Sequence, residues 1–277
     1  MNLGWSILLV GVTTGAAIAA LLLVRRRAPD GGFFNDGDRA AGVFGVLATG
    51  FAILLGFVVF LAFTSYDTSR AGAETEALLV AQQFETAQFL PDEVGLRASQ
   101  ELVCYGRSVV HREWPRMEAG TAGDAINMWG AALFETLRTV EPRSPSEQAA
   151  YGKWLDQTAD REAARISRIH SSEGVIPGPL WLVLFAIAAV IFAFMLFFAD
   201  RAERAVVQGV LIGTVMTVIV ATLLVVEFFD NPYDRGFGSL RPVAMERTLR
   251  ILDQGRRVVD ETGPLPCDAT GAALSAS

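Results

Sequence analysis

Polar residues that could do chemistry are sparse, and none of them completes a catalytic set. His111, Arg112 and Glu113 are adjacent, but the second histidine, His170, falls in a different predicted helix. One histidine with scattered acids does not supply the ligands of a metal site. The sequence also lacks a nucleophile elbow, a phosphate-binding loop and a paired-cysteine motif. We therefore expect no enzyme, no cofactor and no bound metal.

A second polar group, Glu227, Asp230 and Asp234, surrounds the tripeptide Asn231-Pro232-Tyr233. Carboxylates at this spacing could bind a cation or form a charged ring at a pore entrance. The alternative is a capped turn in which Pro232 ends a helix, because proline cannot continue one. The residue types favour the turn.

The chain contains two cysteines, Cys104 and Cys267, which are too few for a disulfide scaffold or a metal cluster. The predicted topology places both on the same side of a membrane. In an oxidising compartment they could pair and tie the C-terminal tail to the soluble domain. The alternative is one half-buried thiol in a helix and one free thiol in the tail.

The sequence elements that position these residues are typical of a membrane protein. The chain of 277 residues is 52% hydrophobic and 19% charged, and its apolar residues are concentrated in four blocks. A helix needs about twenty apolar residues to cross a bilayer. The predicted spans are residues 3–24, 40–65, 174–199 and 205–226. The net charge of −7 argues against nucleic acid as a partner.

The first block could also be a signal peptide, with Ala17-Ile18-Ala19 as its cleavage site. A signal peptide carries its basic residues before the apolar run. Here none precedes the run, and Arg25, Arg26 and Arg27 follow it directly. We therefore predict a retained span.

Residues 42–90 are apolar at first and charged from Tyr66 onward, without a proline before Pro91. We predict one long helix that crosses the bilayer and continues into water. Helical patterns over 66–89, 92–117, 125–140 and 146–169, with no strand pattern, predict a four-helix bundle. The predicted domains are 1–65, with two spans; 66–172, the bundle; 173–229, with two spans; and 230–277. The last comprises an exit turn, an amphipathic helix over 243–259 and a loose tail.

Basic residues in the two short loops set the orientation. Arg25, Arg26, Arg27 and Arg39 lie in one loop, and Arg201 and Arg204 lie in the other. Positively charged short loops stay in the cytoplasm. Both termini and the bundle are therefore predicted to be extracytoplasmic, in a bacterial inner membrane.

The predicted spans contain no acidic, basic or histidine residue. This argues against a coupled transporter or proton pump, but it is compatible with a channel closed by an apolar constriction. Phe51, Phe57 and Phe60 are the candidates for that constriction, and the alternative is that they pack against helices or lipid.

Two pairs of glycines spaced four residues apart could allow close approach of helices, within one subunit or between subunits. These are Gly11 with Gly15, and Gly209 with Gly213.

The order of several short motifs resembles the bacterial bestrophin-like family, long catalogued as a domain of unknown function. No single motif is specific, and the resemblance extends from about residue 40 to about residue 255. The motifs are Ala41-Gly42-Val43-Phe44, Tyr66-Asp67, Glu74, Leu90-Pro91, Tyr105, Glu113-Trp114-Pro115, Leu137-Arg138, Glu141-Pro142-Arg143, Asp230-Asn231-Pro232-Tyr233 and Gly236.

The resemblance implies kinship with bestrophins, which are pentameric anion channels with four membrane helices per subunit and a helical domain between the second and third. Bestrophins hold that domain in the cytosol, whereas the charge pattern here places it outside. The leading hypothesis is a homo-oligomeric protein in a lipid bilayer that conducts an inorganic ion. The alternative is a non-conducting scaffold or envelope sensor that binds a partner through its bundle.

Overall fold

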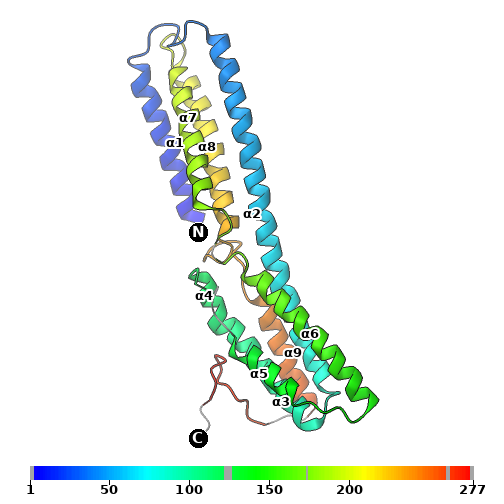
Figure 1. The fold of residues 1–277 in the computed structure, drawn as a ribbon. Helices are drawn as coiled ribbons and strands as arrows, with labels where there is room; N and C mark the ends of the chain where they lie inside the picture. Colours follow the sequence, from blue (N-terminus) through cyan, green and yellow to red (C-terminus); the bar gives the residue numbers. More distant parts are fainter. Residues whose placement is uncertain (1–2, 122–126, 173, 260–262, 275–277) are drawn as a thin grey trace. The chain divides into compact units, whose positions relative to one another are not determined.

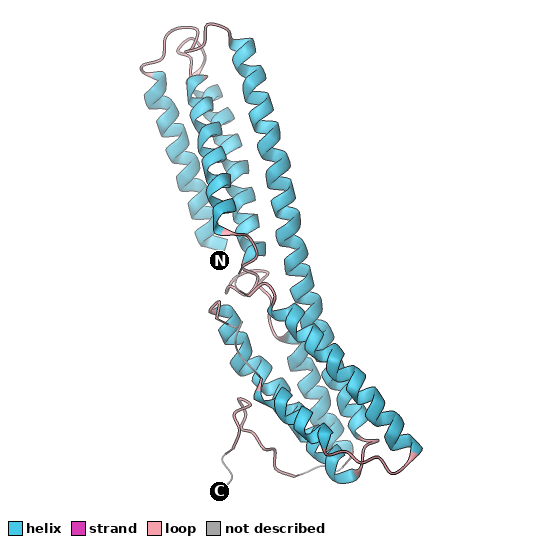
Figure 2. Cartoon of the chain, viewed as in Figure 1, coloured by secondary structure: helices cyan, strands magenta, loops and turns pink. Residues whose placement is uncertain are grey.

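The computed structural model describes residues 3–121, 127–172, 174–259 and 263–274. Within these ranges the regular elements are helices (Figure 2). One isolated β-bridge joins Cys267 and Ala273. The predicted all-α class is confirmed. The chain forms two compact units. We call residues 1–65, 174–231 and 235–238 the membrane unit, and residues 66–173, 232–234 and 239–277 the bundle unit.

Among its described residues, the membrane unit contains four helices that lie side by side (Figure 1). They are α1 (Leu3–Arg25), the first part of α2 (Gly37–Ala87), α7 (Gly178–Phe197) and α8 (Ala205–Asp230). All four are long and apolar enough to cross a membrane, which confirms the number of spans. Helix α2 runs without a break for 51 residues, as its lack of internal proline predicts.

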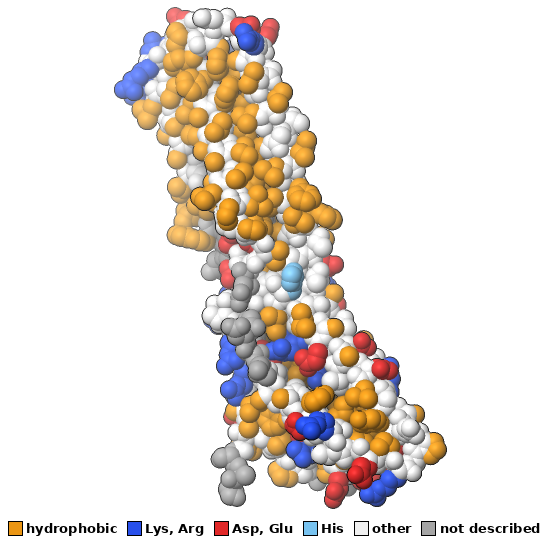
Figure 3. Space-filling view, viewed as in Figure 1, with side chains coloured by type: hydrophobic (Ala, Val, Ile, Leu, Met, Phe, Trp, Pro, Cys, Tyr) orange, Lys and Arg blue, Asp and Glu red, His pale blue; other side chains and the backbone are white. Residues whose placement is uncertain are grey.

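Large apolar side chains cover the outside of the membrane unit (Figure 3). Ile53 of α2, Leu182 of α7 and Val206 of α8 are 70%, 72% and 76% exposed. A soluble protein rarely leaves so much apolar surface in contact with water. Lipid or further copies of the chain must therefore cover this surface.

A core of aliphatic and aromatic side chains joins α2, α7 and α8 within the membrane unit. Phe51, Leu55 and Val58 of α2 pack in the same cluster as Leu184 of α7 and Ile219 of α8. Helix α1 joins the unit along α8. These contacts fix which faces of the four helices point inward.

The two arginine-rich loops of the membrane unit are hydrogen-bonded to each other. Arg25 donates from Nε to the carbonyl of Asp200 at 3.0 Å and from Nη2 to the carbonyl of Arg201 at 3.0 Å. In return, Arg201 donates to the carbonyl of Arg25 at 3.2 Å. The carboxylate of Asp200 accepts the N–H of Gly31, whose φ of +95° is a conformation that favours glycine. The loops therefore close one end of the unit together.

In the part of the bundle unit that the structure describes, the remainder of α2 is followed by six further helical segments. They are α3 (Asp92–Ser108), the π-helix η1 (Val109–Glu113), α4 (Trp114–Glu118), α5 (Met128–Arg138), α6 (Pro145–Ile169) and α9 (Val243–Val258). Asn127 caps α5 by accepting the N–H of Trp129 at 3.0 Å, and Ser144 caps α6 by accepting that of Glu147 at 3.2 Å. The predicted start of α5 at Ala125 lies outside the described residues.

The four-helix prediction for the soluble part was incomplete, because α9 also packs into the bundle core. Met245 and Leu252 of α9 are 2% and 0% exposed, and they belong to the core that includes Val80 of α2 and Leu102 of α3. The hydroxyl of Thr248 also donates to the carbonyl of Ala77 at 2.9 Å. Amphipathic spacing predicts the helix correctly, but it does not say which surface the helix covers.

The prediction of a loose tail was wrong for residues 263–274. There the N–H of Leu274 donates to the carbonyl of Pro266 at 2.9 Å, and that of Asp268 donates to the carbonyl of Ala272 at 2.9 Å. A composition rich in glycine, alanine and serine is typical of flexible chain. Here Gly271, at φ +77°, instead supplies the left-handed residue that a tight turn requires.

Candidate functional site

A buried ionic cluster lies in the bundle unit, around Arg168 of α6. Its guanidinium donates to both carboxylate oxygens of Glu76 on α2, and Nη2 donates to Oε2 of Glu113 at 2.7 Å. The side chains of Arg168 and Glu76 are completely buried, and that of Glu113 is 5% exposed. Arg165, one turn earlier, forms an ion pair with Glu113 at 3.3 Å. Two carboxylates therefore face two guanidinium groups.

Neutral donors complete the hydrogen bonding of both carboxylates. The hydroxyl of Tyr105 donates to Oε1 of Glu76 at 2.6 Å, and Nδ2 of Asn127 donates to Oε1 of Glu113 at 2.5 Å. Burial raises the pKa of Tyr105 well above its ordinary value, and the charge on Glu76 raises it further. Burial alone would lower the pKa of Arg168, but Glu76 and Glu113 outweigh that effect and hold it well above the ordinary value. Arg168 therefore stays charged.

Close approach of α2 and α6 brings Glu76 to Arg168. A Cβ on Gly72 would lie 2.5 Å from the backbone nitrogen of Arg168 and 2.8 Å from the carbonyl oxygen of Ala164. Only glycine allows the two backbones to approach so closely. Glu76 follows one turn later, on the same face of α2. Gly72 therefore sets the distance that the ion pair requires.

The π-helix η1 positions Glu113. Pro115 has no N–H to donate, and its ring would clash with a carbonyl of a regular α-helix. The wider turn accommodates it, and the N–H of Trp114 donates instead to the carbonyl of Val109. A π-turn inserts one extra residue and so changes the direction in which later side chains of the helix point. Glu113, at the end of η1, faces the core.

This cluster was not predicted from the sequence. Glu113 was named beside His111 and in the family-like motif Glu113-Trp114-Pro115, and neither Glu76 nor Arg168 was singled out. The available signals were the motif Glu113-Trp114-Pro115, which marks a disturbed helix, and Gly72 inside a long helix. The charged groups of the cluster pair with one another, so its role is to fix the packing of α2, α3 and α6.

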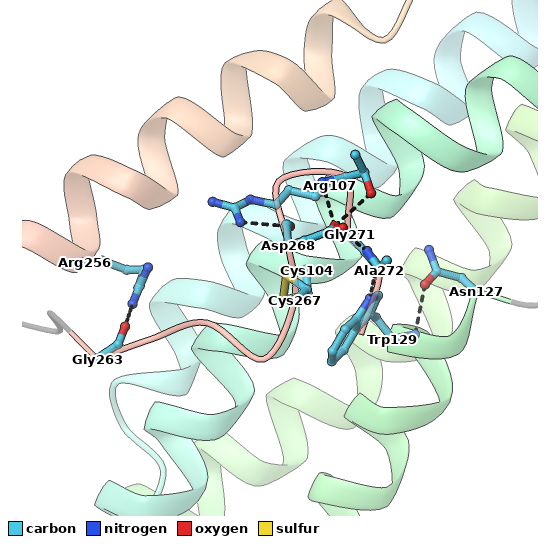
Figure 4. The surroundings of a disulfide bond; sticks show 11 residues. Cys104, Arg107, Asn127, Trp129, Arg256, Gly263, Cys267, Asp268, Gly271 and Ala272 are labelled. Atoms are coloured by element: carbon cyan, nitrogen blue, oxygen red, sulfur yellow. Dashed lines mark hydrogen bonds between the residues drawn. A yellow bond between two sulfur atoms is a disulfide. The ribbon is translucent and has the colours of Figure 1, made fainter. Parts of the chain in front are cut away.

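Cys104 and Cys267 are joined by a disulfide, with their Cα atoms 5.8 Å apart (Figure 4). The bond attaches the C-terminal turn to α3. Beside it, Nε1 of Trp129 donates to the carbonyl of Gly271 at 2.7 Å, and Arg107 donates to the carbonyl of Asp268 at 3.1 Å. A side chain on Gly271 would overlap the backbone of Ser108. The turn is therefore seated directly on α3 and α5.

Asp230, from the predicted exit motif, organises a turn in the membrane unit. Its Oδ1 accepts the backbone N–H groups of Val175 and Ile176 at 2.7 and 2.8 Å, and Oδ2 accepts Nε1 of Trp181 at 3.4 Å. The residue is 4% exposed. Its lone pairs are used to fix the segment that leads into α7. The described residues contain no group of three or more potential metal ligands.

The other members of the exit motif lie beyond the end of α8. Pro232 and Gly236 are in the turns that follow it, and the carbonyl of Pro232 accepts the N–H of Leu240 at 2.8 Å. Tyr233 is buried in the bundle unit, where its hydroxyl donates to the carbonyl of Arg168 and its ring meets that of Trp114 edge-on at 5.5 Å. Tyr233 therefore packs against the ionic cluster.

The comparisons with known proteins agree with this architecture. A family model described as the Bestrophin-like domain matches residues 11–245. The chain belongs to the bestrophin-like family. A search of curated proteins finds no match.

Solved structures share the fold of this bestrophin-like chain. A point variant of a bacterial bestrophin homologue from Klebsiella pneumoniae has a TM-score of 0.65 at 14% identity, covering 90% of this chain and 98% of that one. A second variant of the same homologue has a TM-score of 0.64 at 15% sequence identity, with the same coverage of both chains. A variant described only as a membrane protein has a TM-score of 0.66 at 13% sequence identity, covering 92% of this chain and 99% of that one. Identities this low establish the fold alone.

The three phenylalanines of the predicted constriction do not share a face of α2. Phe51 is 5% exposed and packs against α7 and α8, whereas Phe57 and Phe60 are 59% and 63% exposed. Successive helical residues are about 100° apart, so Phe51 and Phe60 point in nearly opposite directions. Phe51 is therefore part of the subunit core, and only Phe57 and Phe60 remain available outside it.

The two glycine pairs also differ in their surroundings. A Cβ on Gly213 of α8 would lie 3.2 Å from Ile18 of α1, and one on Gly209 would lie 3.7 Å from the same residue. Beside them the hydroxyls of Thr14 and Thr217 are hydrogen-bonded at 3.0 Å. Gly11 and Gly15 have no described atom within 4 Å of such a Cβ. Gly209 and Gly213 therefore allow α8 to pack against α1 within the subunit, whereas Gly11 and Gly15 face outward.

Proposed function

We propose that the protein is a homo-oligomeric channel that conducts inorganic anions across a bacterial inner membrane. The observation that carries this proposal is an apolar stripe on α2, formed by Val46, Ile53, Phe57 and Phe60. These residues are 77%, 70%, 59% and 63% exposed. Their spacing of seven, four and three residues keeps them on one face of a helix. That face is opposite the core residues Phe51 and Leu55.

A ring of copies arranged with this stripe inward would line a pore with apolar side chains. Such a lining can close a pore by excluding water, and it needs no charge within the membrane. The absence of charged residues from the predicted spans is consistent with this form of gating. Bestrophins, the family's namesakes, are anion channels, which supports the choice of anions over cations.

Flux through the reconstituted protein tests the proposal. In liposomes, we expect the purified full chain to carry chloride current. Substituting Phe57→Ala and Phe60→Ala together should raise the open conductance several-fold, because smaller side chains widen the neck and admit water. The control is Val206→Ala on α8, which is also exposed, at 76%, but lies outside the stripe. A complete absence of current in both proteins, with folding intact, would refute the channel.

We also infer that the bundle unit is extracytoplasmic. Disulfides persist in oxidising compartments and are rare in the cytosol, which supports an external location for Cys104 and Cys267. The arginines of the two short loops belong on the cytoplasmic side by the positive-inside rule. Helix α2 begins beside these loops and crosses the membrane before it enters the bundle unit. The two arguments are independent and give the same orientation.

Thiol trapping in intact cells tests this orientation. Cells quenched with acid and treated with a maleimide-linked polymer should show no gel shift, because both thiols are oxidised. Adding a reductant before the polymer should produce a shift by two polymer units. The single variant Cys267→Ser, which leaves Cys104 unpaired, serves as the control for reactivity. Free thiols in the quenched wild-type protein would place the bundle in the cytosol.

A further inference from the structure

A hollow with a volume of about 630 Å³ lies between α2 and α9 in the bundle unit. Alanines on both helices create it, because their short side chains do not fill the space between the backbones. Ala73 and Ala77 belong to α2, and Ala244 belongs to α9. Trp114 and Leu240 also line the hollow, and Nε1 of Trp114 donates to the carbonyl of Leu240 at 3.3 Å. That bond fixes the apolar part of the lining.

Positive charge dominates the sides of the hollow. Arg70, Arg241 and Arg247 line it, together with a single acid, Glu74. Glu74 pairs with Arg70 at 3.1 Å, in an exposed contact that largely neutralises both. Among the described residues, Arg241 and Arg247 have no recorded hydrogen bond or ion pair, and both are exposed. Two guanidinium groups thus remain available for a ligand.

The N-terminus of α9 adds to the positive electrostatic potential of the hollow. Val243 and Ala244, the first two residues of the helix, also line the hollow. The first N–H groups of a helix have no acceptor within it, and they carry partial positive charge. Free guanidinium groups and the start of a helix therefore favour an anion at the same end of α9.

We propose that this hollow binds an amphipathic anion, in which a phosphate or carboxylate group is carried on an apolar body. Arg241 and Arg247 hold the anionic group, because a guanidinium matches two oxygens of such a group at once. The apolar body lies over Ala73, Ala77 and Leu240. The chemistry fits both the headgroup region of an anionic lipid and a soluble organic phosphate. The proposal is independent of ion conduction.

Binding of octyl phosphate to the full-length protein tests this site. The protein is placed in nanodiscs of phosphatidylcholine alone, and tryptophan fluorescence follows the titration, because Trp114 lines the hollow. We expect saturable binding. Arg241→Ala and Arg247→Ala should each weaken it about tenfold, the size expected for one charge-assisted contact. Arg250→Ala is the matched control, since it changes an exposed arginine of α9 that does not line the hollow.

Two further arms distinguish the source of the anion. If nanodiscs containing phosphatidylglycerol abolish octyl phosphate binding to the wild-type protein, the site takes a lipid; if glycerol 1-phosphate competes instead, it takes a soluble phosphate. Either result supports the proposal. Binding that Arg241→Ala and Arg247→Ala leave unchanged would overturn it. It would also be overturned if these variants dissociated the oligomer, because the hollow would then be a contact between subunits.

Discussion

Replacing Arg168 with methionine is expected to lower the free energy of unfolding of the bundle unit by about 3–5 kcal/mol, the usual cost of removing one partner from a buried ion pair. Methionine has a similar length, so the effect does not come from an empty cavity. It comes from leaving Glu76 and Glu113 buried at 0% and 5% exposure without the cation that both contact. Urea unfolding in detergent, followed by tryptophan fluorescence, measures the change.

Arg138→Met provides the matched control. Arg138 pairs with Glu135 at 3.1 Å, but the two side chains are 65% and 64% exposed. Exposed pairs contribute about 0–1 kcal/mol, so this substitution should be nearly neutral. Adding Glu76→Gln to Arg168→Met should restore part of the lost stability, because it removes one uncompensated charge. If Arg168→Met and Arg138→Met cost the same, the cluster does not hold the bundle together.

Features that depend on long runs of similar residues could be predicted from the sequence. The four spans follow from apolar stretches of bilayer length, and the 51-residue helix α2 follows from the absence of proline between its apolar and charged halves. Such patterns involve many residues, so no single side chain decides them. The resemblance to the bestrophin-like family likewise rested on the order of many weak motifs.

Features that depend on one contact between distant segments could not be predicted. Nothing near Arg168 in the sequence indicates that it meets Glu76, which is 92 residues away. The direction in which α2 turns each side chain decides that Phe51 is buried in the core and Phe57 is exposed. Composition does not reveal this difference, because both residues are phenylalanines in the same apolar run. The tail has the composition of a flexible segment, and its turn depends on Cys104, Arg107 and Trp129, all far away in sequence.

The second large effect is expected from removing the disulfide. The double variant Cys104→Ser, Cys267→Ser should lower the free energy of unfolding of the bundle by about 2–5 kcal/mol, because a cross-link restricts the unfolded chain more as the loop it closes lengthens. Here the cysteines are 163 residues apart. The loop includes α7 and α8, and we expect these apolar membrane helices to stay helical in detergent when the bundle unfolds, because their backbone groups must remain hydrogen-bonded in an apolar environment. The gain in chain entropy is therefore smaller than for a free coil, and we expect the lower half of that range.

A second variant separates the covalent link from the packing of the turn. Gly271→Val keeps both cysteines, but a side chain there would overlap the backbone of Ser108 and would be strained at φ +77°. If packing of the turn stabilises the bundle, Gly271→Val should be as destabilising as the double serine variant. If the cross-link itself is responsible, Gly271→Val should retain most of the stability, and reductant should then remove it. An unchanged urea midpoint in the double serine variant would contradict the cross-link explanation, and an unchanged midpoint in Gly271→Val would contradict the packing explanation. If neither variant shifted the midpoint, the tail would not be an element that closes the bundle.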